Sequence, residues 1–138
     1  MKYRKIPFPN VALVFAALLA ALPVLAHHAF EAEFDQDKHI TVTGVLTKLD
    51  WVNPHVYVYL DAKDEKGQIV HWQFNSVPPL MLRKGGLDRS MFVIGQTYTI
   101  DGYGAKDGSR TLGWLKTLHF PDGRAIDILR DEDKIVQK

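Results

Sequence analysis

The chain has 138 residues, which suits one domain, and it has no cysteine, which excludes disulfides, thiolate metal sites and cysteine-dependent catalysis. Its formal net charge is +1, but the first 26 residues hold three of the 17 basic residues and no acid, so residues 27–138 carry 14 − 16 = −2. That part of the chain has no basic stripe to meet phosphates, which argues against nucleic acid as a partner.

The first segment, residues 1–26, is predicted to be a signal peptide. Three basic residues precede an uncharged run over residues 11–26, which is shorter than the ~20 apolar residues that a membrane span needs. Small residues at the end of this run suit signal peptidase. We therefore expect cleavage after Ala26, export to the periplasm or the medium, and membrane contact only through the uncleaved segment. A retained N-terminal anchor helix is the alternative.

Residues 27–138 are expected to form a single exported domain, because no linker or repeat interrupts them and their apolar residues recur with period two. Ser76 is a candidate cap for a short helix that Gly85 and Gly86 would end. Three strands, a helix and further strands are the order of an OB-fold-like Greek-key barrel of five to six strands, a mainly β class, with a β-sandwich as the alternative. The predicted strands are residues 40–49, 55–61, 68–75, 96–103, 111–120 and 125–129.

The strands over residues 55–61 and 68–75 are predicted to form a hairpin with one apolar and one polar face. Aromatic, imidazole and amide side chains on the polar face are stacking and hydrogen-bonding groups, and OB-folds bind ligands across this part of the sheet. Cross-strand pairs of Tyr and His that only stabilise the hairpin are the alternative. Together with Trp51 and Asn53 from the preceding turn, the candidate ligand-binding residues are Tyr57, Tyr59, His71, Gln73 and Asn75.

The sequence LAHHAF, residues 25–30, places two histidines at the predicted cleavage site. As a mature first residue, His27 would offer an α-amine and a ring nitrogen that chelate one metal ion together. His28 offers a competing chelate. Nitrogen sets of this kind favour Cu(II), and the α-amine has a pKa of about 7.7–8.0, so copper displaces its proton readily. A flexible segment that tolerates two histidines is the alternative.

The sequence WVNPH, residues 51–55, supplies the third candidate copper ligand, His55. Pro54 restricts the residue before it, so the turn is stiff, and His55 opens a strand directly after it. A rigid turn favours a functional role for this ring. The acidic residues over 31–37 alternate with other residues, which suggests an edge strand with an acidic face. They could supply an oxygen ligand or a hydrogen-bond acceptor near the metal. A solvated acidic stretch without a role in binding is the simpler alternative.

Motifs of common enzymes are missing: the chain has no G-x-S-x-G elbow, no P-loop and no separated carboxylate pair that calls for glycosidase chemistry. The glycine-containing loop over residues 102–108 does not precede a predicted helix, so phosphate binding is not expected there. The tryptophans are expected in the core, and His39 and His119 are interpreted as ordinary surface residues.

The motifs together resemble a bacterial family of small exported proteins described only as a domain of unknown function. The resemblance spans nearly all of residues 27–138, with one departure at residues 102–105, and it implies export and one small β domain but no activity. The segments that carry it are residues 26–30, 44–46, 51–55, 67–72, 95–100, 106–109 and 121–124.

Three functional hypotheses follow. The first is an exported copper-binding protein that uses His27, His55 and His28 for copper carriage, buffering or electron transfer. The second is a metal-free OB-type module that binds a small molecule, a glycan or an exported partner protein on the hairpin face. The third, an enzyme such as a copper oxidase, is ranked last because the sequence shows no substrate cleft or acid–base constellation.

Overall fold

The structure is a computed structural model that describes residues 30–128. The predicted signal peptide, His27 and His28 therefore lie outside the described residues. The chain divides into two compact units, residues 1–33 and 34–138. In the first unit, residues 30–33 form a short helical turn, and the second unit holds the sheet.

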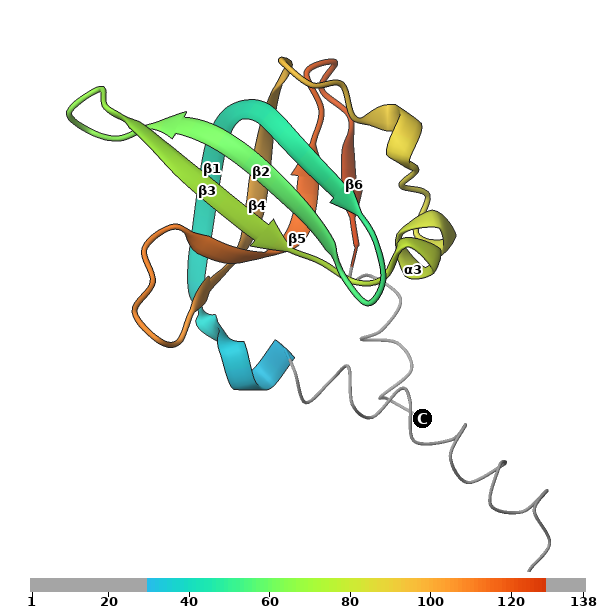
Figure 1. Ribbon diagram of the computed structural model, residues 1–138, viewed down its shortest axis with the longest axis horizontal. Helices are drawn as coiled ribbons and strands as arrows, with labels where there is room; N and C mark the ends of the chain where they lie inside the picture. The colour runs from blue at the N-terminus through green and yellow to red at the C-terminus, as the bar shows by residue number, and fades with distance from the viewer. Residues whose placement is uncertain (1–29, 129–138) are drawn as a thin grey trace, which may run out of the picture. The chain divides into compact units, whose positions relative to one another are not determined.

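The described part of the second unit is mainly β, as predicted, and its strands form one sheet with the order β3-β2-β1-β4-β5-β6 (Figure 1). Neighbours in this order are antiparallel, and β3 also pairs with β5 in a parallel ladder, so the sheet returns on itself. The strands are β1 (Phe34–Trp51), β2 (Val56–Lys63), β3 (Ile69–Asn75), β4 (Thr97–Ala105), β5 (Leu112–His119) and β6 (Ala125–Asp127).

The β1 strand has 18 residues and is longer than predicted, because pairing with β4 extends it through polar residues that show no apolar alternation. Phe34 begins the strand, is 1% exposed and packs its ring against Trp114 at 5.5 Å between centroids. The expected acidic edge strand over residues 31–37 is wrong in part. Residues 31–33 are helical, whereas residues 34–37 belong to the end of β1 that precedes its pairing with β2, which begins at Gly44.

Two short helices connect β3 to β4: α3 (Pro79–Lys84) and the 3-10 helix η1 (Arg89–Met91). The predicted end of the helix is confirmed, since Gly85 caps α3 and Gly86 has φ of +88°, which glycine adopts at little cost. The predicted cap is wrong: α3 begins after Pro78. Ser76 is instead fully buried, and its backbone N–H donates to the Val56 carbonyl oxygen.

The core follows from alternation along β2, where Val56, Val58 and Leu60 are each at most 1% exposed. The same inner surface receives Tyr98 from β4 and apolar residues from β5 and the helical connection. Burial of each such side chain contributes about 1.5–3 kcal/mol to folding. The apolar face of each strand therefore packs inward, and the opposite, polar face is left for binding. Within residues 30–128, no helix has the length and apolar character needed to cross a membrane.

Candidate functional site

The predicted polar face of the β2–β3 hairpin is confirmed by the register of the two strands. Tyr57 lies opposite Asn75, Tyr59 opposite Gln73, and Asp61 opposite His71. Gln73 Nε2 donates a hydrogen bond to Asn75 Oδ1 at 2.9 Å. Side chains in directly opposed positions are close enough to interact, so the face is a connected polar surface.

A groove of about 560 Å³ lies along this face where the β4–β5 loop approaches β3. The backbone N–H of Gln73 donates to the Thr111 carbonyl oxygen at 2.9 Å, which holds the loop beside the strand. Three of the predicted residues, Tyr59, His71 and Gln73, line the groove. Sequence reasoning missed its other lining residues, which are Thr47, Lys48, Asp61, Trp72, Ser109, Thr111 and Leu112.

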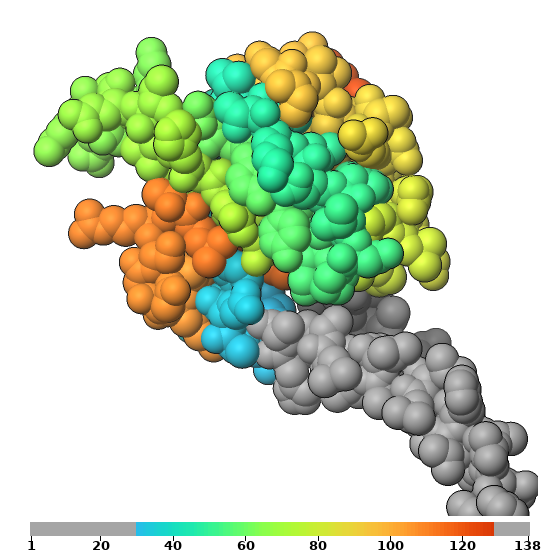
Figure 2. All heavy atoms as spheres, in the orientation of Figure 1, coloured from blue at the N-terminus to red at the C-terminus, as the bar shows by residue number. Residues whose placement is uncertain are grey.

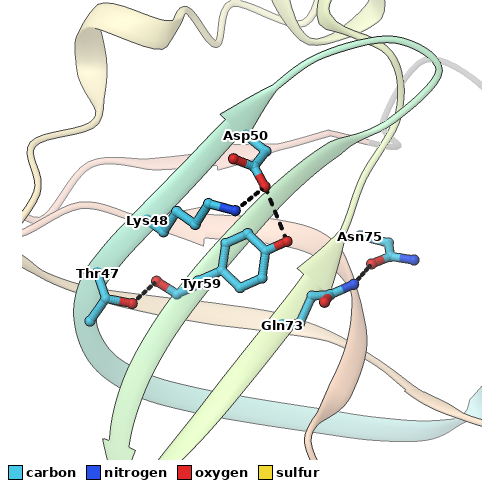
Figure 3. A network of polar contacts seen from close by, with 6 residues as sticks. All are labelled: Thr47, Lys48, Asp50, Tyr59, Gln73 and Asn75. Atoms are coloured by element: carbon cyan, nitrogen blue, oxygen red, sulfur yellow. Dashed lines mark hydrogen bonds and ion pairs between the residues drawn. The ribbon is translucent and has the colours of Figure 1, made fainter.

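Lys48, Asp50 and Tyr59 form a hydrogen-bonded network at one side of the groove (Figure 3). Lys48 Nζ lies 2.6 Å from Asp50 Oδ2, and Tyr59 Oη donates to the same oxygen at 3.2 Å. The hydrogen bond from Lys48 lowers the pKa of the Asp50 carboxyl, and the same contact raises the pKa of Lys48. Burial, followed by the Asp50 hydrogen bond, raises the pKa of Tyr59. The network keeps Asp50 ionised and fixes the Tyr59 ring.

His71 and Asp61 form a second pair in the groove, with Nδ1 2.6 Å from Asp61 Oδ1. The His71 side chain is 80% exposed, whereas that of Asp61 is 29% exposed. A carboxylate only accepts, so Nδ1 carries the proton and the Nε2 side of a neutral ring is left as an acceptor. The groove therefore presents an imidazole, an amide and hydroxyl groups to a polar ligand.

His55 lies at the entrance to β2 and is held on several sides. Its Nδ1 is 2.9 Å from the Ser76 carbonyl oxygen, so Nδ1–H donates and a neutral ring keeps its acceptor lone pair on Nε2. The ring is half-buried and meets Tyr57 and Trp114 edge-on, at centroid distances of 6.5 and 6.1 Å. Both the tautomer and the orientation of this ring are thereby fixed.

The remaining predicted ligand-binding residues lie outside the lining of this groove. Trp51 is half-buried, packs edge-on against Phe92 at 6.0 Å, and has an Nε1 without a hydrogen-bond partner. Asn53 is exposed in the β1–β2 turn, where its bond to Pro54 is cis. The structure therefore brings Tyr59, His71 and Gln73 together with the loop. It places Trp51 at the end of β1 and Asn53 in the β1–β2 turn.

Of the predicted copper ligands, His55 is the one that falls within the described residues; His27 and His28 lie outside them. Among residues 30–128, no group of three His, Cys, Asp or Glu side chains comes close enough to hold a metal ion.

A further polar cluster lies on β1, β4 and β5, where sequence reasoning saw only a surface histidine. His119 Nε2 is 2.6 Å from Asp101 Oδ2, and Thr41 Oγ1 donates to Asp101 Oδ1 at 2.6 Å. The Thr41 hydroxyl, and then His119, lower the pKa of the Asp101 carboxyl. Because the three residues come from three strands, only their register, and no local motif, would have revealed the cluster.

Comparison with known proteins places this chain in a family. A family model described as a family of unknown function, DUF6152, matches residues 16–113. The match covers more than half of the chain, so the chain belongs to that family. It includes the LAHHAF sequence, β1 to β4 and the Thr111 side of the groove. No curated protein gives a significant match.

Proposed function

We propose that this member of a family of unknown function is an exported copper-binding protein, with residues 1–26 removed and His55 as one ligand. The observation that carries the proposal is the hydrogen bond from His55 Nδ1 to the Ser76 carbonyl oxygen at 2.9 Å. Metal-binding histidines commonly donate their other ring N–H to a carbonyl or carboxylate, which fixes the tautomer and the direction of the lone pair. His55 has this arrangement before any metal binds.

Copper is favoured over other metals by the chemistry of the complete ligand set. The proposed set is the amine and ring of His27, with His28 as the competing chelate, and Nε2 of His55. These ligands are all nitrogen, and Cu(II) prefers tetragonal nitrogen ligation and stands highest in the affinity series of divalent metals. The chain has no cysteine, so no thiolate competes for the ion.

Two other histidines among residues 30–128 fit this role less well because their rings are more exposed to solvent, 80% for His71 and 42% for His119. His55 is half-buried between aromatic rings, so its orientation costs little entropy when a metal binds. We infer carriage, buffering or electron transfer as the role.

Native mass spectrometry of protein purified from the exported fraction tests the proposal, because it reports the first residue and bound copper together. We expect a chain that begins at His27 and carries one copper ion. Mutation of a residue that only supports a metal ligand costs roughly 10–100-fold in metal affinity. His55→Ala removes a proposed ligand, so it should weaken Cu(II) binding by at least that factor. His71→Ala is the matched control and should leave the affinity unchanged.

Two results would count against copper binding. One is a chain that begins at His27 and stays metal-free when Cu(II) is added. The other is unchanged Cu(II) affinity in both His55→Ala and His27→Ala. A different first residue would remove the chelating amine from His27 and with it the proposed ligand set.

We also propose that the sheet is a closed OB-fold-like barrel. The pairings β1–β2, β2–β3, β3–β5, β5–β4 and β4–β1 form a ring, and α3 lies between β3 and β4 in the chain. A parallel pair between the third and fifth strands supports this assignment. OB-folds bind ligands across the face that includes the second and third strands, which is where the groove lies.

Binding of a polar ligand in that groove, without metal, is the second candidate function. The observation that favours it is the convergence of Tyr59, His71 and Gln73 with the β4–β5 loop. An oligosaccharide library can be screened by following the NMR signals of the Tyr59 and His71 rings. Binding that survives His27→Ala but is lost in Gln73→Ala would favour this function, and unchanged signals throughout would argue against it.

A further inference from the structure

The connection between β3 and β4 exposes an unusual share of the apolar surface of the described chain. Among residues 30–128, seven large apolar side chains are exposed, and four of them belong to residues 79–94, which we name the α3–η1 segment. The four are Leu80, Met81, Val93 and Ile94, with exposed fractions of 60%, 38%, 47% and 58%. The atoms of this segment gather on one side of the domain (Figure 2).

These side chains are presented by a well-anchored backbone. Leu82 and Leu87 are each 1% exposed and fix the segment to the core. The Tyr98 hydroxyl accepts a hydrogen bond from the Val93 N–H at 2.8 Å and donates to the Met91 carbonyl oxygen at 3.3 Å. Four exposed apolar side chains on one well-anchored segment suit a surface that a partner covers.

The charge of the α3–η1 segment identifies the kind of partner. It carries the exposed cations Arg83, Lys84 and Arg89 and one acid, Asp88, so its net charge is 3 − 1 = +2. Residues 27–138 as a whole carry −2, so this segment is a local exception in a chain with an acidic excess. The one acid is already engaged, because Asp88 accepts hydrogen bonds from the backbone and side chain of Ser90.

A groove of about 660 Å³ adjoins the segment and combines the same two kinds of side chain. Arg89 lines it together with Phe92 and Ile94. Its remaining lining residues are Thr47, Lys48 (which is paired with Asp50), Leu49, Asp88 and Ser90. A cation beside apolar side chains suits a partner that offers phosphate groups directly above hydrocarbon.

We propose that the α3–η1 segment docks the protein on the surface of an anionic lipid bilayer. The apolar side chains would enter the boundary between headgroups and acyl chains, and the cations would meet the headgroup phosphates. Each cation near an anionic membrane surface strengthens binding by about fivefold. This inference is independent of copper binding, because none of its residues is a proposed copper ligand.

Co-sedimentation with vesicles tests this proposal, with the chain purified from the exported fraction and EDTA present to remove metal. We expect binding to vesicles of phosphatidylglycerol and phosphatidylcholine, and much weaker binding to phosphatidylcholine alone. The double variant Arg83→Gln, Lys84→Gln should bind the anionic vesicles roughly 25-fold more weakly, at fivefold per charge. The double variant Leu80→Ser, Ile94→Ser should also lose binding while keeping the wild-type circular dichroism.

The β2–β3 hairpin supplies matched controls, because Ile69 is as exposed as Ile94, at 61%, and Lys66 is an exposed cation. Ile69→Ser and Lys66→Gln should bind vesicles as the wild type does. Equal binding to both vesicle types, or equal losses in the control variants, would overturn the proposal. Binding to poly-glutamate with none to vesicles would overturn it as well, and would indicate an acidic polypeptide as the partner.

Discussion

Removal of one hydroxyl group, in Tyr98→Phe, should destabilise the connection between β3 and β4 more than its small size suggests. The Tyr98 side chain is 1% exposed, and its hydroxyl bonds both the Val93 N–H and the Met91 carbonyl oxygen. The variant leaves these two backbone groups without that partner. A buried polar group left unsatisfied costs about 1–3 kcal/mol, and the lower half of this range applies because water reaches the part-buried loop.

We therefore expect the free energy of unfolding to fall by about 1–2 kcal/mol in Tyr98→Phe. In a domain of this size, each kcal/mol lost lowers the melting temperature by roughly 4–8 °C. Urea unfolding followed by tryptophan fluorescence measures the change, which should appear in the midpoint at constant slope. Tyr57→Phe is the control, since the Tyr57 side chain is half-buried at the hairpin face, and a change within ~0.5 kcal/mol is expected there. Equal stability of Tyr98→Phe and the wild type would refute the reasoning.

Three further predictions concern the sheet and its polar clusters. Gly102→Ala should destabilise the fold by at least about 1–3 kcal/mol in urea unfolding, because a Cβ there would overlap the Trp114 carbonyl oxygen. A stability within ~0.5 kcal/mol of wild type would contradict this. The depressed pKa of Asp101 stabilises the fold above the ordinary carboxyl pKa of about 3.8, and this contribution is lost as the pH falls through the depressed value. The stability difference between wild type and Asp101→Asn can be measured by urea unfolding at several pH values, and it should shrink on acidification. The difference should stay below about 1 kcal/mol, since the Asp101 side chain is 40% exposed. A difference that grows at low pH would contradict this prediction. Tyr59→Phe should raise the pKa of Asp50 toward its ordinary value in an NMR titration, because one hydrogen bond to the carboxylate is lost while that from Lys48 stays; an unchanged pKa would exclude the contact.

The β class and the hairpin were predictable from the sequence because alternation over residues 55–61 and 68–75 is a local signal. It assigns Val56, Val58 and Leu60 to the core, as the structure confirms. The start of β1 was not predictable, because residues 35–39 are polar and become a strand only through pairing with β4. Ser76 has the side chain of a typical helix cap. Its backbone instead pairs with Val56, as the backbone in β3 pairs with β2, and this pairing leaves Ser76 buried.

The candidate site was predictable only in part, for a similar reason. Tyr59, His71 and Gln73 follow from strand alternation, whereas the loop residues Ser109 and Thr111 reach the groove through the β3–β5 pairing. Parallel pairing between strands that are far apart in the chain leaves no local pattern. The hydrogen bond from His55 to the Ser76 carbonyl oxygen likewise joins residues 21 positions apart.

The placement of β1 between β2 and β4 also sets the order in which the chain can fold. The β2–β3 hairpin joins residues about ten positions apart, such as Asp61 and His71, so it closes a short loop. Pairing of β1 with β4 joins residues 60 positions apart, such as Thr41 and Asp101, and the chain entropy of that closure is lost before most core contacts form. We therefore expect the β2–β3 hairpin to form before β4 pairs with β1.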